Sequence, residues 1–165
     1  MNAVHDTYLG LGGNVSPRRK SITDALTALA SHGEVVATSP FVESPAWGYQ
    51  DHRTYINAVC HFRTELSPIA LLDLAESLER RAGRSEKTTT DYAPRTLDID
   101  ILFYDQGIVN LPRLIIPHPR LHLRKFVLVP LAAIAPDLIH PTLRLSVREM
   151  LEKTPDTSKI HILPQ

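Results

Sequence analysis

Residues 94–104 read PRTLDIDILFY, and this stretch near the middle of the chain predicts a β-strand because apolar side chains recur at every second position. The apolar face consists of Leu97, Ile99, Ile101 and Phe103. The opposite face carries Asp98 and Asp100, about 6.5–7 Å apart, since residues i and i+2 of a strand point the same way. The stretch therefore predicts a strand with one apolar and one acidic face.

Two neighbouring carboxylates on one strand face require a compensating partner. Aspartate is disfavoured in strands, and a pair flanked by apolar residues is costly unless a cation lies near it. One interpretation is the solvated face of an edge strand, since Asp-x-Asp alone is a weak signal. The other is a magnesium site, because Mg²⁺ takes one or two carboxylates and leaves its other positions to water and substrate phosphates. Arg95, three residues before Asp98, adds a planar cation for the same phosphates and favours phosphoryl-type chemistry.

Length and composition narrow the class of protein. A chain of 165 residues is predicted to form one domain, residues 1–165, with its own core. Eighteen basic and eighteen acidic side chains balance, which argues against a dedicated nucleic-acid-binding protein. The single cysteine, Cys60, rules out an intramolecular disulfide and indicates a reducing, cytoplasmic location, with Cys60 as a small buried apolar residue. We expect neither a signal peptide nor a membrane partner, since no segment has the required apolar length.

Hydrophobic periodicity predicts the element order β-α-β-β-α-β. The expected strands are 5–11, 35–42, 55–64 and 96–104, and the expected helices are opened by Ser16-Pro17 and Ser67-Pro68 and ended by Gly33 and Gly83. A turn at 105–107 is expected to lead into a hairpin strand near 108–109. A loop at 111–119, helices at 126–134 and 146–151, and an edge strand at 159–163 follow. This order is that of an α+β, ferredoxin-like βαββαβ sandwich with an added hairpin strand and C-terminal helices.

A glycine-rich segment, residues 10–14 (GLGGN), follows the first strand and precedes the first helix. It lacks the Gly-Lys-Ser/Thr ending of a P-loop, and Val15 stands where a G-x-G-x-x-G motif needs its last glycine. The segment therefore predicts a tight turn from strand to helix.

Two further segments carry candidate binding residues. Residues 44–48 (SPAWG) and 55–57 (YIN) bracket a loop that holds Trp47, which is either an aromatic anchor of a surface loop or a wall of a pocket for a planar ligand. Within residues 113–126, the side chains of Arg113, His118, Arg124 and Phe126 bring together two cations, an imidazole and an aromatic ring. There, His118 is either a loop hydrogen-bonding residue or part of a site. No zinc-ligand spacing and no G-x-S-x-G motif is present.

Taken together, these segments resemble the 6-hydroxymethyl-7,8-dihydropterin pyrophosphokinase family of folate biosynthesis. The resemblance runs from about Thr7 to Leu151, and its most specific part is residues 94–100, in order with residues 8–14, 55–58, 83–84 and 117–131. It implies a ferredoxin-like fold. It also implies transfer of pyrophosphate from ATP to the hydroxymethyl group of the dihydropterin, giving AMP and the pterin pyrophosphate.

The resemblance also implies roles for particular residues. Asp98 and Asp100 would hold two Mg²⁺ ions, with Arg84 and Arg95 as further catalytic residues. The implied pterin-binding residues are Ser44, Pro45, Trp47, Tyr55, Asn57 and Phe126. The implied ATP-binding residues are Glu79, Arg84, Lys87, Tyr92, Arg95, Ile101, Arg113, His118 and Arg124. The expected partners are these two small molecules, without nucleic acid or membrane, and we expect a monomer.

Residues 85–93 (SEKTTTDYA) depart from the family pattern, which has more basic residues and a tryptophan here. Glu86 and Asp91 are acidic, Tyr92 takes the place of the tryptophan, and Lys87 is the only cation. Because this loop is a lid in the family, we hypothesise a closure with fewer charge contacts to ATP and a weaker nucleotide affinity.

Two alternative functions stay open at the level of sequence. A Mg²⁺-dependent phosphohydrolase would use the same acidic strand, but it needs a water-activating base that we cannot name. A non-enzymatic ferredoxin-like module, either RNA-binding or ligand-sensing, gives no reason for two aspartates beside Arg95.

Overall fold

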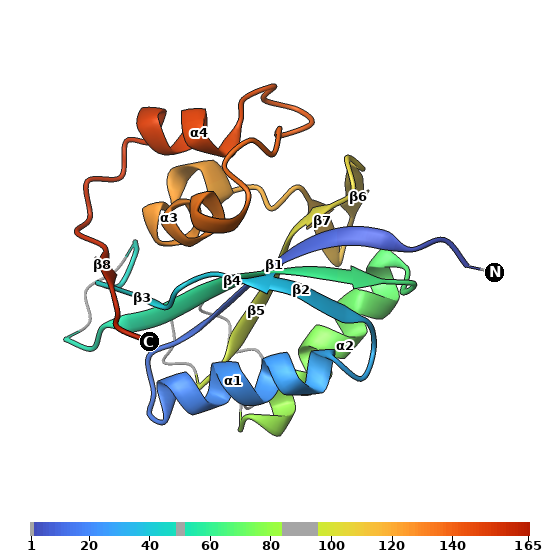
Figure 1. Ribbon diagram of the computed structural model, residues 1–165, viewed down its shortest axis with the longest axis horizontal. Coiled ribbons are helices and arrows are strands. Elements are labelled where there is room, and N and C mark those ends of the chain that lie inside the picture. The colour runs from blue at the N-terminus through green and yellow to red at the C-terminus, as the bar shows by residue number, and fades with distance from the viewer. Residues whose placement is uncertain (1, 49–51, 84–95) are drawn as a thin grey trace.

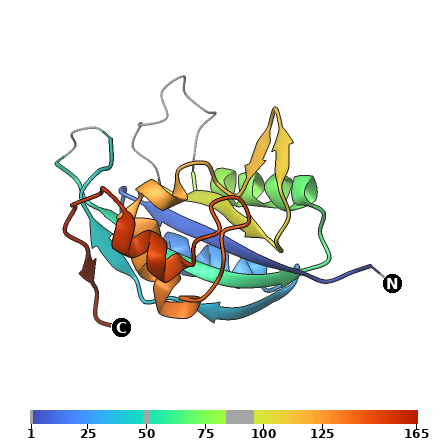
Figure 2. The same cartoon turned by 90° about the horizontal axis from the view of Figure 1, so that it is seen from above.

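The computed structural model describes residues 2–48, 52–83 and 96–165 (Figure 1). It is an α+β structure in which an antiparallel six-stranded sheet separates two pairs of helices. Helices α1 (Arg18–Leu29) and α2 (Pro68–Arg81) cover one face. Helices α3 (Lys125–Ile134) and α4 (Val147–Lys153) cover the other, and in the view from above in Figure 2 they lie in front of the sheet.

The sheet has the strand order β5-β1-β4-β3-β8, and β2 also pairs with β4. Its strands are β1 (His5–Gly13), β2 (Glu34–Thr38), β3 (Val42–Ser44), β4 (Tyr55–Thr64), β5 (Asp98–Tyr104) and β8 (His161–Ile162). Every pairing is antiparallel. The acidic strand β5 therefore lies beside β1, next to the glycine-rich segment.

Two cores hold the layers together. Between the sheet and α1 and α2, buried side chains alternate along the strands, as Leu9, Leu11 and Ile99 do. Between the sheet and α3 and α4, a second core includes Val59 and Leu128. Cys60, predicted to be a buried apolar residue, is buried in the first core, and burial raises the pKa of its thiol to about 12.

One of the two predicted helix caps is present, and a further helix has a cap that was not predicted. The Ser67 hydroxyl accepts a hydrogen bond from the Ala70 N–H at 3.2 Å, and Ser146 forms a reciprocal capping box with Glu149. The prediction that Ser16 caps the first helix is wrong. That helix begins at Arg18, after Pro17, without a side-chain cap.

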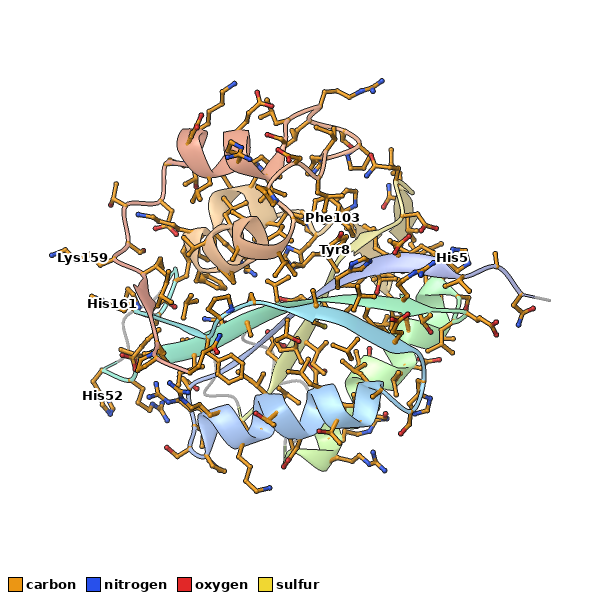
Figure 3. All side chains as sticks on the ribbon, in the orientation of Figure 1. His5, Tyr8, His52, Phe103, Lys159 and His161 are labelled. Carbon is orange, nitrogen blue, oxygen red and sulfur yellow. The ribbon has the colours of Figure 1, made fainter. Side chains whose placement is uncertain are left out.

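The predicted alternation of β5 breaks at its end. Tyr8 pairs with Phe103 and Leu9 pairs with Ile101, so Leu102 is an extra residue opposite β1. Such a bulge reverses the faces of the residues that follow it. Phe103 was predicted to share a face with Ile101 but packs in the second core, on the α3 side of the sheet (Figure 3).

Two predicted strands also differ from the structure. The strand expected at 35–42 is divided into β2 and β3. At the break, the Ser39 N–H still donates to the Val59 carbonyl oxygen at 2.8 Å, but the Ser39 hydroxyl accepts the Val59 N–H at 2.9 Å, and the next residue, Pro40, has no N–H to donate. The strand expected after the turn at 105–107 does not pair with β5. Instead, β6 (Val109–Leu111) pairs with β7 (Leu114–Ile116) in a separate two-stranded ribbon, within what was predicted to be a loop.

The predicted edge strand near the C-terminus is confirmed as β8, beside β3. A 3₁₀ turn, Leu121–Leu123, precedes α3. Within the described residues, none of the helices has the length and apolar character needed to cross a membrane.

Candidate active site

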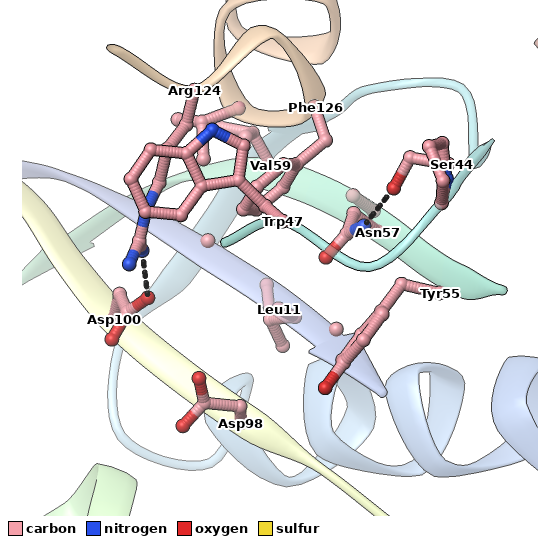
Figure 4. Close-up of a pocket in the computed structure, with 15 residues that line it drawn as sticks. Leu11, Ser44, Trp47, Tyr55, Asn57, Val59, Asp98, Asp100, Arg124 and Phe126 are labelled. Atoms are coloured by element: carbon pink, nitrogen blue, oxygen red, sulfur yellow. Dashed lines mark hydrogen bonds and ion pairs between the residues drawn. The ribbon is translucent and has the colours of Figure 1, made fainter. Parts of the chain in front are cut away.

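A pocket opens on the α3 face of the sheet, with strands β1, β4 and β5 as its floor (Figure 4). The segment after β3 and the start of α3 form its walls. Nine of the predicted site residues line it, namely Ser44, Pro45, Trp47, Tyr55, Asn57, Asp98, Asp100, Arg124 and Phe126. Residues from five segments of the chain thus meet in one cavity.

The acidic side of the pocket is built by the pairing of β5 with β1. Asp98 lies opposite Gly12 and Asp100 lies opposite Gly10, so both carboxylates project from one face above a strand with no side chains there. Both are half-buried and line the pocket, as the alternation predicted. Gly10 and Gly12 line the pocket beside the two carboxylates.

The acidic pair fits a magnesium ion that is shared with a phosphorylated substrate. Among residues 2–48, 52–83 and 96–165, no group of three or more His, Cys, Asp or Glu side chains is placed to hold a metal by itself. Mg²⁺ typically takes only one or two protein carboxylates and completes its shell with water and phosphate oxygens. Two half-buried carboxylates at an open pocket meet that requirement.

Two basic side chains lie near Asp100. His118 Nε2 and Arg124 Nη1 each lie 3.9 Å from Asp100 Oδ2. Burial lowers the pKa of His118 to about 4, and the Arg124 guanidinium acts in the same direction. The imidazole is therefore neutral at pH 7, while Arg124 supplies the positive charge.

The aromatic side of the pocket is joined to the acidic side through Arg124. Its guanidinium carbon lies 4.8 Å from the centre of the Trp47 ring and 5.7 Å from that of the Phe126 ring. A cation over an aromatic face is attracted by the ring quadrupole. Arg124 thus lies between Trp47 and Asp100, as Figure 4 shows. Tyr55 borders the same cavity from the first position of β4.

An amide is held at the inner end of the pocket. Asn57 is 9% exposed, and its Nδ2 donates a hydrogen bond to Ser44 Oγ at 3.3 Å. A Cβ atom at Gly12 would lie 2.0 Å from Asn57 Oδ1, so only glycine leaves room for this side chain. The Oδ1 acceptor and the second Nδ2 donor of Asn57 are suited to form hydrogen bonds with the edge of a planar heterocycle.

The sequence analysis missed the role of the glycines. Residues 10–14 were predicted to form a turn, but β1 continues to Gly13, and Gly10 and Gly12 form the floor of the pocket. The available signal was the spacing of two glycines at i and i+2 in a strand, which marks a close approach of another group.

Besides His118, which lies near Asp100 without lining the pocket, three described residues predicted to bind ATP do not line it. Glu79 is buried in α2, and its Oε2 accepts a hydrogen bond from the Ile99 N–H at 2.9 Å. Ile101 is buried in the first core, on the face opposite the carboxylates. Arg113 Nη2 lies 2.8 Å from Asp73 Oδ1. Their contacts with ATP stay predictions.

The other predicted residues, Arg84, Lys87, Tyr92 and Arg95, lie outside the described residues, as does the loop hypothesised to close over ATP.

Comparisons with known sequences agree on one protein family. The family model described as 7,8-dihydro-6-hydroxymethylpterin-pyrophosphokinase (HPPK) matches residues 8–136. A 2-amino-4-hydroxy-6-hydroxymethyldihydropteridine pyrophosphokinase of Haemophilus influenzae is 38% identical over 159 residues, which cover 95% of this chain and 98% of that protein. The folic acid synthesis protein fol1 of Pneumocystis carinii is 40% identical over 95% of this chain. The chain spans only 21% of that longer protein.

Solved structures with a similar fold are less similar in sequence. The crystal structure of wild-type Plasmodium falciparum HPPK-DHPS with pteroate matches 93% of this chain with a TM-score of 0.72 and 14% sequence identity. The match covers 45% of that chain. At this identity, the likeness concerns the fold alone.

Proposed function

The chain belongs to the 7,8-dihydro-6-hydroxymethylpterin-pyrophosphokinase family, and we propose that its pocket transfers pyrophosphate from ATP to 6-hydroxymethyl-7,8-dihydropterin. In this reaction the hydroxymethyl oxygen forms a bond to the β-phosphorus of ATP. The bond from that phosphorus to the α–β bridging oxygen breaks, AMP leaves with the bridging oxygen, and the hydroxyl proton is released. The observation that carries the proposal is one cavity lined by Asp98 and Asp100 on one side and by Trp47, Tyr55 and Phe126 on the other.

In the proposed complex, the pterin lies in the aromatic part of the pocket. Tyr55 and Phe126 stack on its faces, and Asn57 pairs with its edge through one donor and one acceptor. The hydrogen bond from Asn57 to Ser44 orients the amide before the ligand arrives. Pro45 and Trp47 complete the lining.

ATP is proposed to bring its phosphates to the acidic side. Asp98 and Asp100 would hold two Mg²⁺ ions, which when bound neutralise phosphate charge and lower the pKa of the attacking hydroxyl. Arg124 is proposed to turn from Asp100 to the phosphates. Neutral His118 is suited to donate or accept a hydrogen bond there without adding charge. Arg84 and Arg95 are proposed as further phosphate-binding residues.

We further propose that residues 1–165 form a single pyrophosphokinase domain of the ferredoxin-like type. The order β1-α1-β2-β4-α2-β5 along the chain supports this, together with the sheet order β5-β1-β4 in which β2 also lies beside β4. A monomeric state and a cytoplasmic location are part of the same proposal.

Incubation with ATP, Mg²⁺ and the hydroxymethyldihydropterin tests the function. We expect AMP and the pterin pyrophosphate in equal amounts, with no product after chelation of magnesium. Release of inorganic phosphate without a pterin product would favour a phosphohydrolase. Pterin binding without turnover in the presence of Mg²⁺ and ATP would favour a ligand-sensing module.

A further inference from the structure

The segment after α4, residues 154–164, runs along the outside of the pocket walls and then enters the sheet as β8. We call it the C-terminal strap. Figure 1 shows it descending beside α3 to β3, and Figure 3 marks Lys159 and His161 along it. It lies beyond residues 8–136, which the family model matches, and its sequence holds no motif that points to the chemistry.

One end of the strap is joined to the start of α3. The N-cap of this helix, Arg124, makes no side-chain cap. In its place, Asp156 Oδ2 accepts a hydrogen bond from the Lys125 N–H at 2.9 Å. A carboxylate at this position satisfies a free helical N–H and interacts favourably with the helix dipole. Lys125 stands between Arg124 and Phe126, so the contact is made at the pocket wall itself.

Asp156 is held in place from within the strap. Its Oδ1 accepts hydrogen bonds from the Ser158 N–H at 2.9 Å and from Ser158 Oγ at 2.5 Å. Burial raises the pKa of Asp156, but the hydrogen bonds from Ser158 and Lys125 outweigh it and leave the pKa below its usual value. The carboxylate is therefore ionised at neutral pH, and both of its oxygens are engaged.

The other end of the strap is joined to β3. Ile162 pairs with Val42, and His161 pairs with Glu43. The Leu163 N–H donates to the Phe41 carbonyl oxygen at 2.8 Å, which extends the pairing by one residue. The last residue of β3 is Ser44, which accepts the hydrogen bond from Asn57 in the pocket.

We propose that the C-terminal strap positions both walls of the pocket, with Asp156 as the positioning residue for the α3 wall. The proposal rests on the proposed function in one respect, namely that the ligand between these walls is the pterin. Asp156 does not touch the ligand. Its effect passes through Lys125 to Arg124 and Phe126, which line the cavity.

The single tryptophan of the chain provides a readout that needs no ligand. Trp47 stacks on Arg124 at 4.8 Å, so its fluorescence and its quenching by acrylamide report how the α3 wall is placed. We expect Asp156→Ala to make Trp47 more accessible to acrylamide. We also expect it to raise the dissociation constant of 6-hydroxymethyl-7,8-dihydropterin about fivefold, the size typical of one lost helix cap.

Two control variants separate positioning from a general loss of stability. Asp156→Asn keeps an oxygen that accepts the Lys125 N–H and should stay within about twofold of the wild-type dissociation constant, since asparagine is a good N-cap. Asp137→Ala removes the same kind of carboxylate from a side chain that is 87% exposed and pairs with Arg148, so neither readout should change.

Wild-type Trp47 quenching together with a wild-type pterin dissociation constant in Asp156→Ala would overturn the proposal. If that variant does not fold, Ser158→Ala tests the proposal with the same two readouts. This substitution removes the Ser158 hydroxyl that donates to Asp156 and keeps the Ser158 N–H that donates to the same oxygen. If the wild-type chain does not bind the pterin, the proposed function is contradicted instead. The comparison of Trp47 quenching would still decide the role of the strap.

Discussion

Replacement of Gly12 by alanine is expected to impair pterin binding through the side chain of Asn57. The two residues are direct partners in the pairing of β1 with β4. The added methyl carbon would lie 2.0 Å from Asn57 Oδ1 and 3.2 Å from the Ile56 carbonyl oxygen. The backbone oxygen cannot turn away, so the Asn57 amide must leave its place.

The size of the effect follows from what Asn57 is proposed to do. One donor and one acceptor to the pterin edge, each worth about 0.5–1.5 kcal/mol, give a loss of about 1–3 kcal/mol. That loss corresponds to an increase of about fivefold to about 150-fold in the dissociation constant. The added methyl group also crowds a packed interior, which should lower the free energy of unfolding by about 1–3 kcal/mol.

Calorimetric titration with the dihydropterin and urea unfolding measure the two effects separately. Gly10→Ala is the matched control, since it adds the same methyl group to the same face of β1. There, the nearest atoms are side-chain carbons of Leu102 at 3.6–3.8 Å, an ordinary contact. We expect a much smaller change in pterin affinity for Gly10→Ala than for Gly12→Ala.

A double-mutant cycle tests the route of the effect. If the methyl group acts by displacing Asn57, then Gly12→Ala should cost little further affinity in an Asn57→Ala background, because residues in contact are not additive. A pterin dissociation constant for Gly12→Ala within twofold of wild type would refute the reasoning. Full additivity of the two losses would refute the route through Asn57.

Three further substitutions test other parts of the site. Asp100→Ala should leave less than about a tenth of the rate of AMP formation, a barrier increase of at least ~1.4 kcal/mol, with a urea midpoint close to wild type; retention of more activity would contradict the metal-binding role. Tyr55→Ala should weaken pterin binding about twofold to about 13-fold and ATP binding less, since an aromatic pair contributes about 0.5–1.5 kcal/mol, and equal losses in two titrations would count against stacking. Glu79→Ala should lower the free energy of unfolding by about 1–3 kcal/mol in urea, because the Ile99 N–H loses its buried acceptor, whereas Glu79→Gln keeps an acceptor and should lose less; equal values for the two would disprove this contact.

The sequence pattern predicted local structure correctly where a residue type serves one structural purpose. The alternation of residues 97–101 predicted the two faces of β5 up to the bulge, and Ser67 marked a helix start because a hydroxyl satisfies free N–H groups. The reading of residues 10–14 as a turn failed, since a glycine is equally suited to a turn and to a strand that another group approaches closely. Only the partner strand distinguishes the two.

The sequence by itself determined the acidic strand and the βαββαβ order of the main elements, because these depend on residue type and short spacing, and it supplied the candidate residues for binding a pterin and phosphates. Only the tertiary structure decided which of them share a cavity. Arg124 meets Trp47, and Asp156 meets Lys125, across long stretches of chain. Such contacts depend on how α3 packs over the sheet, and no local periodicity records that packing.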